Sequence, residues 1–473
     1  MSVTELCFKE ATELARLIRE KQVSCLEVMQ AHLAQIERVN PRFNAIVTLL
    51  PERALEGARA ADAAIARKAT LGPLHGLPIA HKDLVPTKGI RTTYGSPIYA
   101  NHVPDEDALI VQRLRAAGAI TIGKTNTPEF GAGSQTFNPV FGATLNPYDP
   151  SKTCGGSSGG AAVALAARML PIADGSDTGG SLRNPAGFCN VIGFRTSPGR
   201  VPVYPNPLGW WTISVQGPMA RTVRDTALML SAIAGPDARS PIALADPGES
   251  FRRPLERDFR GVRIAWTPDL GGLPVDARVL AVLESRRAAF TALGCELDEA
   301  CPDFADAEEI FQVWRAWRFE ARYAELLPTH RHQIKDTVIW NTEQGMKLTG
   351  PQVARAEMKR TALYQRMRAF METHEFLVCT TNQVPAFDVK QPYVTEINGV
   401  KLPTYIDWMK ACWYITVTGH PCISVPAGFT EDGLPVGIQI VGRHQDDWGV
   451  LQLAHAFERA TNAWQRVPAL AQA

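Results

Sequence analysis

Two serines surrounded by glycine are the residues of this sequence best suited to covalent chemistry. Ser157 lies in the run from Cys154 to Gly160, and Ser181 ends a second run that begins at Asp174. Glycine allows positive φ angles and lets backbone N–H groups come close to a bound group. A phosphate cradle and an oxyanion hole both need this property, so the glycines alone leave the chemistry open.

Two known motifs that use such runs fit poorly here. A phosphate-binding P-loop ends in Gly-Lys-Ser or Gly-Lys-Thr, whereas this run continues as Gly160-Ala161. Gly155 to Gly159 matches the nucleophile elbow of α/β-hydrolases, but an elbow follows an apolar strand and residues 146–153 are turn-forming. A pair of tight turns with only a packing role is the remaining alternative to catalysis.

Taken together, the motifs of the chain resemble the amidase signature family of amidohydrolases. The resemblance covers about residues 5–235 and 375–462. The matching segments are Leu74 to Asp83, Gly123 to Asn126, Pro128 to Phe130, Gly155 to Gly160, Asp177 to Arg183, Phe188-Cys189, Gly199 to Val201, Gly217 to Val223, Gly419 to Pro421, Gly433 to Gly437 and Gln439. Such a combination of motifs is highly specific.

The resemblance implies a catalytic triad of Ser181 as nucleophile, Ser157 as proton relay after a cis peptide bond, and Lys82 as terminal base. A serine hydroxyl becomes a good nucleophile only when a neighbour takes its proton, and a lysine can do so only when it is neutral. Free lysine titrates near roughly 10.4, and burial lowers that pKa by up to several units. The apolar run Leu77 to Ala80 supplies such surroundings, so we expect Lys82 to be desolvated.

The resemblance also assigns roles to the loop around the nucleophile. The expected oxyanion hole consists of the backbone N–H groups of Thr178, Gly179, Gly180 and Ser181. Asp177 and Arg183 match positions that support this loop without taking part in the chemistry. Ser158 is expected to hydrogen-bond the loop rather than to react.

Two positions depart from the family pattern. His81 stands immediately before the lysine, where an apolar residue is usual. Because successive residues of a strand face opposite ways, we expect its imidazole to point away from the site. Gly193 to Ser197 replaces the common Gly-x-Lys-Pro-Thr, a change that affects fine positioning rather than the triad.

The substrate pocket is predicted from small and aromatic residues. Gly131, Ala132 and Gly133 would leave room beside the scissile carbonyl. Several tryptophans either line an apolar pocket or belong to the core, namely Trp210, Trp211, Trp314, Trp317, Trp340, Trp408 and Trp413. Our hypothesis is an aryl or hydrophobic amide substrate, with carbamates and esters as further substrates.

The predicted activity is hydrolysis of a carboxylic amide C–N bond through an acyl-enzyme on Ser181, without cofactor or metal. One alternative is the glutamine-hydrolysing subunit of a tRNA-dependent amidotransferase, which would need partner subunits. Another is a non-catalytic binding protein on the same fold, although the retained Lys82, Ser157 and Ser181 argue against it.

The elements that must position these residues alternate between helices and strands. Residues 10–40 form a predicted helical hairpin whose second helix starts at a capping box of Ser24 and Glu27, and a further helix starts at Pro51. Later helices are predicted over 106–117, 161–170, 222–233, 278–293 and 447–459, and strands over 74–81, 119–125, 262–266, 376–379, 422–425 and 436–441. This alternation predicts an α/β fold, with a mixed sheet covered by helices on both faces.

We predict one domain over residues 1–473. Its parts are a signature core at about 65–235, a helical insertion at about 302–374 and a C-terminal core portion at about 375–462. The insertion is rich in tryptophan and arginine, and it either roofs the site or forms a plain helical layer over the sheet.

Composition narrows the partners and the compartment. The chain has 473 residues, 45% of them hydrophobic, and a formal charge of +1, so it has no net field that would attract nucleic acid or a membrane surface. It shows no signal-peptide pattern and no spanning segment, so we expect a cytoplasmic protein. The nine cysteines lack metal-binding spacing and His330 and His332 stand alone, so we expect reduced thiols and no metal. The expected partners are a small amide and, by default, a second copy in a homodimer.

Overall fold

The N-terminal segment forms helices, as its apolar periodicity predicts. The computed structural model describes residues 3–472. Its first four helices are α1 (Val3–Phe8), α2 (Ala11–Arg19), α3 (Cys25–Phe43) and α4 (Pro51–Ala66). The capping box is present: Ser24 Oγ accepts from the Glu27 N–H at 3.1 Å, and Glu27 Oε2 accepts from the Ser24 N–H at 2.7 Å.

The centre of the molecule is a mixed sheet of eight strands in the order β10-β9-β11-β15-β14-β7-β8-β6. Its strands are β6 (Ile172–Asp177), β7 (Ile192–Arg195), β8 (Val215–Ala220), β9 (Arg263–Trp266), β10 (Glu296–Glu299), β11 (Phe376–Thr380), β14 (Cys422–Phe429) and β15 (Pro435–Gly442). Strands β9, β10 and β11 run parallel, and the remaining pairs are antiparallel. The predicted mixed sheet is therefore confirmed.

A second, smaller sheet carries Lys82. It has three strands in the order β1-β3-β2, namely β1 (Ile46–Leu49), β2 (Pro78–Lys82) and β3 (Ile120–Thr125). Strand β2 packs against β6, the edge strand of the main sheet. The lysine thus lies at the junction of two sheets, an arrangement that the sequence pattern did not predict.

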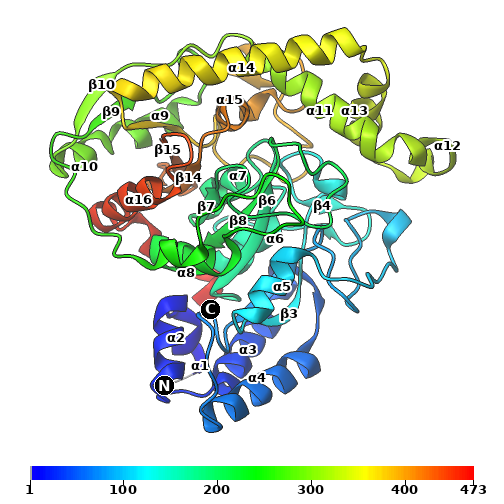
Figure 1. Ribbon diagram of the computed structural model, residues 1–473, viewed down its shortest axis with the longest axis vertical. Coiled ribbons are helices and arrows are strands. Elements are labelled where there is room, and N and C mark those ends of the chain that lie inside the picture. Colours follow the sequence, from blue (N-terminus) through cyan, green and yellow to red (C-terminus); the bar gives the residue numbers. More distant parts are fainter. Residues whose placement is uncertain (1–2, 473) are drawn as a thin grey trace.

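Helices cover both faces of the main sheet (Figure 1). Helix α7 packs on β7, β14 and β15, α16 packs on β14 and β15, and α8 packs on β8. The helices of residues 109–292 and 410–472 are α5 (Leu109–Ala116), α6 (Gly159–Ala166), α7 (Arg183–Cys189), α8 (Val223–Ile233), α9 (Ala277–Glu284), α10 (Arg287–Ala292), α15 (Lys410–Thr418), α16 (Asp447–Thr461) and α17 (Ala469–Gln472). The structure thus has the predicted α/β architecture.

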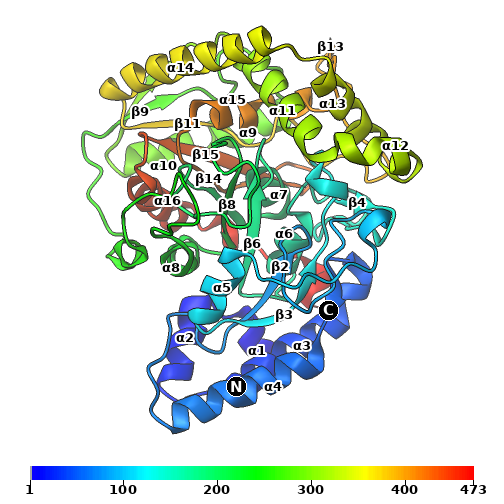
Figure 2. The same ribbon diagram turned by 45° about the vertical axis from the view of Figure 1, so that its right-hand side comes forward.

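The stretch between β10 and β11 is helical. It contains α11 (Ala307–Tyr323), α12 (Leu327–His330), α13 (Asp336–Met346) and α14 (Gly350–Thr373). Figures 1 and 2 both place these helices at the end of the molecule opposite the N-terminal helices. Helix α11 packs against α13, α14 and α15. The division of the chain into a core and an insertion remains a prediction.

Some elements differ from the sequence prediction. The helix predicted over 278–293 is broken at Ser285 and Arg286 into α9 and α10. Strands β6, β7 and β8 were not predicted, because they contain Gly, Asp and Pro, residues that are rare in strands. Short two-residue strands complete the structure, namely β4 (Phe137–Asn138), β5 (Gly142–Ala143), β12 (Glu396–Ile397) and β13 (Val400–Lys401).

Candidate active site

Lys82 ends strand β2 with its side chain completely buried. Its Nζ donates to Ser157 Oγ and to Ser158 Oγ, both at 2.8 Å, and to Ser176 Oγ at 3.2 Å. Burial lowers the pKa of Lys82 from its ordinary 10.5 to about 7, although the charge of Asp174 opposes this shift. A large share of the amine is therefore neutral at neutral pH, which is the state a general base needs.

A buried carboxylate fixes the backbone at the lysine. Asp174 Oδ1 accepts from the Lys82 backbone N–H at 2.7 Å, and Asp174 Oδ2 lies 2.6 Å from His81 Nδ1. The other ring nitrogen of His81 lies 3.1 Å from Thr121 Oγ1. The imidazole is therefore buried against Asp174 and Thr121 and faces neither the solvent nor the Lys82 amine. The sequence motif contains Asp174 without indicating a role for it, and only the fold reveals its contact with Lys82.

The loops that carry Ser157 and Ser181 are joined by a backbone hydrogen bond. The peptide bond between Gly156 and Ser157 is cis. Ser134 Oγ donates to the Gly156 carbonyl at 2.7 Å, which holds this segment from one side. On the other side the Ser158 N–H donates to the Ser181 carbonyl at 3.1 Å. Ser158 thus joins the two loops through its backbone while its hydroxyl accepts from the lysine.

Ser181 lies in the loop between β6 and α7, and Asp177 shapes this loop from within. Asp177 Oδ1 accepts from the Gly180 N–H at 2.9 Å, so this N–H, one of four expected in the oxyanion hole, is already engaged. Within residues 3–472 no hydrogen bond engages the N–H groups of Thr178, Gly179 or Ser181. Gly180 has φ +115° and a Cβ there would lie 2.6 Å from Cys412 Cβ, so no larger residue fits. The oxyanion hole remains a prediction, with three of its four expected N–H groups unengaged.

Two buried arginines hold Asp177. Arg183 Nη2 lies 2.9 Å from Asp177 Oδ1 and Arg195 Nη1 lies 3.1 Å from the same oxygen. Burial alone would raise the pKa of Asp177, but the charges of Arg183 and Arg195 hold it well below its usual value. Arg183 also donates to Gln439 Oε1 at 2.7 Å, which ties the loop to β15. Arg195 was missed at the sequence level, although it lies in the segment that departs from the family pattern.

A cavity of about 410 Å³ opens beside this group of residues. Ser176, which accepts from Lys82, lies in its wall, and so does Ser214, whose Oγ is 3.0 Å from Thr178 Oγ1. The aromatic residues of the wall are Tyr94, Tyr99, Phe130, Tyr204, Trp211 and Tyr323. Helix α11 contributes Arg318 and Arg322 to the same wall. The helical stretch therefore lines the cavity rather than lying only on the sheet.

Tyrosine and phenylalanine form this wall more than the tryptophans do. Trp211 alone of the tryptophans singled out in the sequence lines the cavity, whereas Trp408 and Trp413 are buried in the core and Trp210 is 78% exposed. The sequence could not separate these roles because a buried tryptophan looks the same in either setting.

The three small residues proposed for substrate binding lie close by but in different surroundings. A Cβ on Gly131 would lie 3.5 Å from Ser157 Oγ, so this residue is next to the proposed relay. Ala132 is fully buried in an apolar cluster with Phe130. A Cβ on Gly133 would lie 3.8 Å from Lys335 Nζ. Their role in binding substrate remains a prediction.

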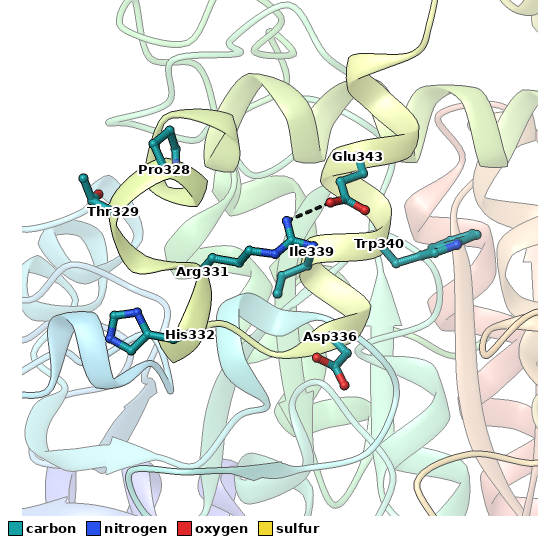
Figure 3. Close-up of a pocket in the computed structure, with 8 residues that line it drawn as sticks. All are labelled: Pro328, Thr329, Arg331, His332, Asp336, Ile339, Trp340 and Glu343. Carbon is teal, nitrogen blue, oxygen red and sulfur yellow. Dashed lines mark hydrogen bonds and ion pairs between the residues drawn. The ribbon is translucent and has the colours of Figure 1, made fainter.

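A second hollow lies on the surface between α12 and α13 (Figure 3). Its side chains include Arg331, which is paired with Glu343 at 2.7 Å, and Trp340 at one side. None of the hydroxyl or amine groups around Lys82 lines it. His332 is a lone imidazole at its rim, and the described residues contain no cluster of three or more His, Cys, Asp or Glu that could hold a metal.

Known proteins resemble this chain over nearly its whole length. A sequence model of the family described as Amidase matches residues 27–451. An acylamidase of Rhodococcus erythropolis is 36% identical over 98% of each chain, and a glutamyl-tRNA(Gln) amidotransferase subunit of Moorella thermoacetica is 35% identical over 98% of this chain and 99% of the relative. Among solved structures, a bacterial aryl acylamidase of the amidase signature family aligns with TM-score 0.89 and 29% identity over 98% of each chain.

The fold and these similarities define an enzyme that hydrolyses amide C–N bonds. More narrowly, the chain belongs to the amidase signature family, as its motifs predict. Within residues 3–472 we find no helix with the length and apolarity needed to cross a bilayer.

Proposed function

We propose that this protein hydrolyses an aryl or hydrophobic amide through an acyl-enzyme on Ser181. The observation that carries the proposal is the buried Lys82 amine, hydrogen-bonded to Ser157 Oγ at 2.8 Å with its pKa lowered to about 7 by burial. A neutral amine next to a serine hydroxyl is the arrangement in which a lysine acts as base.

In the first step Ser181 Oγ attacks the carbonyl carbon of the amide. Its proton passes to Ser157 Oγ while the Ser157 proton passes to Lys82 Nζ. The carbonyl π electrons move onto oxygen, and the N–H groups of Thr178, Gly179 and Ser181 stabilise the oxyanion. Each such donor typically contributes about 2.7–4 kcal/mol to transition-state stabilisation.

In the second step the tetrahedral intermediate collapses. The C–N bond breaks, the leaving nitrogen takes a proton from Ser157, and Ser157 regains a proton from Lys82. The amine departs and an ester on Ser181 remains. Water then attacks this ester by the same relay, which releases the carboxylic acid and restores the serine.

The substrate class follows from the cavity beside Lys82. Its aromatic wall suits an aryl or otherwise apolar group, and aromatic side chains contribute large apolar area at such sites. The named activities of the acylamidase and aryl acylamidase relatives support this choice. Aryl carbamates and esters are further substrates because the same oxyanion chemistry serves them.

The test is hydrolysis of p-nitroanilides, aryl carbamates, L-glutamine and p-nitrophenyl esters by the wild type, Ser181→Ala and Lys82→Ala. Ser151→Ala is a matched control, because Ser151 is an exposed serine six residues before Ser157. We expect anilide turnover in the wild type and the control, and a loss of at least about 10³-fold in the other two variants. Anilide turnover that persists in Ser181→Ala would overturn the proposed mechanism.

A glutamine-hydrolysing subunit is a second candidate function, because some relatives are named as amidotransferase subunits. In that case L-glutamine would be the preferred substrate of the panel and anilides would be poor ones. Fluorophosphonate labelling separates both candidates from a non-catalytic binding protein, because only an activated Ser181 reacts with the probe.

A further inference from the structure

Helix α11 directs positive charge at the cavity. Arg318 and Arg322 are four residues apart, so they lie on one face of the helix, and both line the cavity beside Ser176. No Asp or Glu is among the described residues that line it. Among the described residues of this wall, His102 is the only other side chain with a nitrogen that can carry a positive charge. The wall is therefore electropositive and aromatic.

Arg318 has no carboxylate partner in the part of the chain that the structure describes. Its guanidinium lies 5.1 Å from the centre of the Trp211 ring, and no ion pair joins it to an acid. Neighbouring Arg315 has a hydrogen-bond partner, because its guanidinium donates to the Tyr405 hydroxyl. Burial lowers the pKa of Arg318 to about 10, so the group stays charged at neutral pH.

Arg318 is half-buried, and a charged group partly withdrawn from water without a counter-ion is costly unless something compensates it. A ring face offsets part of this cost through a cation–π contact, but it leaves the N–H donors of the guanidinium without an acceptor. The planar fork of an arginine fits a carboxylate in a two-point geometry. The cavity supplies the space in which such an anion can reach Arg318.

We propose that this cavity binds a substrate that carries a carboxylate as well as the scissile amide, with Arg318 as the anion-binding residue and Arg322 adding positive charge beside it. The inference rests on the proposed function in one respect, since it takes the cavity beside Lys82 and Ser176 as the substrate cavity. The aromatic residues then hold the apolar part between the amide and the carboxylate.

The test measures binding in the Ser181→Ala background by calorimetry, so that it does not depend on turnover. Two ligand pairs place the carboxylate on either side of the amide: 4-anilino-4-oxobutanoate against N-phenylpentanamide, and 4-acetamidobenzoate against 4-methylacetanilide. Each pair is measured with Arg318 retained and with Arg318→Gln or Arg318→Lys. Arg355→Gln is the matched control, since Arg355 is exposed on α14 and has no ion pair in the described residues.

We expect the carboxylate ligand of at least one pair to bind tenfold or more tighter than its neutral partner, which corresponds to about 1.4 kcal/mol. This preference should fall below threefold in Arg318→Gln, persist in part in Arg318→Lys, and remain in Arg355→Gln. It should also weaken as salt is added. Equal binding within both pairs, or a preference that Arg318→Gln leaves unchanged, would overturn the proposal.

The two proposals fail separately. If the Ser181→Ala background shows a carboxylate preference and turnover does not need Ser181, the anion site is retained and the acyl-enzyme is rejected. Serine-dependent turnover without any carboxylate preference would do the reverse. Unfolding midpoints of the Arg318 variants identify loss of fold, in which case Arg318→Lys, which keeps the charge, decides the question.

Discussion

The pH dependence of hydrolysis tests the role of Lys82 directly. Burial, opposed by Asp174 and Asp177, lowers the pKa of this amine from 10.5 to about 7. At about 1.36 kcal/mol per unit, the environment disfavours the charged form by roughly 5 kcal/mol. At pH 7 about half of the enzyme then holds a neutral lysine, against roughly three molecules in ten thousand for a free side chain.

We therefore expect kcat/KM for an anilide to rise with pH through about 7 and to level off above it. The base must be neutral to act, so activity is lost as pH falls through the pKa and the amine becomes charged. The rate constant of Ser181 inactivation by a fluorophosphonate should follow the same curve. The measurement spans pH 5 to 10, and the rise of kcat/KM with pH is called the limb of the profile. A limb near pH 10, or a kcat/KM that does not change with pH, would refute the role of Lys82 as a desolvated base.

The Asp174→Asn variant should shift the pH at which kcat/KM rises, in a direction that the structure predicts. The negative charge of Asp174 raises the pKa of Lys82, so its removal should move the limb to lower pH, by about one unit. The amide keeps an oxygen for the Lys82 backbone N–H, which Asp174 binds at 2.7 Å. His81→Leu is the control, and loss of the pH dependence in that variant would refute its assignment to Lys82.

Two further substitutions test the scaffold around the serines. Asp177→Asn leaves Arg183 and Arg195 buried with uncompensated charge. The free energy of unfolding, measured in urea, should therefore fall by about 3–5 kcal/mol. A loss below about 1 kcal/mol would contradict the importance of these ion pairs. Gly131→Ala places a Cβ 2.8 Å from Leu84 Cδ1 at φ +70°, next to Ser157, and should lower kcat for an anilide at least tenfold. Gly89→Ala shares the φ of +70° but has open space around its Cβ, so equal losses of kcat in both variants would reject a steric cause near the relay.

Much of the fold could be predicted where local signals were strong. The capping box at Ser24 and the proline at Pro51 mark helix starts that the structure confirms. The apolar strands β11, β14 and β15 were also predicted, because their residues have high strand preference. Strands β6 to β8 were missed since tertiary pairing stabilises segments whose own residues disfavour a strand.

The candidate site was predictable only as far as its motifs extend. The resemblance named Lys82 and Ser157, and the structure brings Lys82 Nζ within 2.8 Å of Ser157 Oγ. The cavity wall was not predictable, because Arg318 and Tyr323 come from a helix far along the chain whose position depends on packing against α13 and α14. Periodicity shows which face of such a helix is buried but not which cavity that face lines.

Asp177 connects the nucleophile loop to the electrostatics of the lysine at the centre of the site. Asp177 is a buried anion whose charge raises the pKa of Lys82 and so works against a neutral base. Arg183 and Arg195 both pair with Asp177, and their charges hold the pKa of this carboxyl well below its usual value. The carboxylate therefore remains ionised and accepts from the Gly180 N–H at 2.9 Å. Arg195 thus supports the nucleophile loop through Asp177.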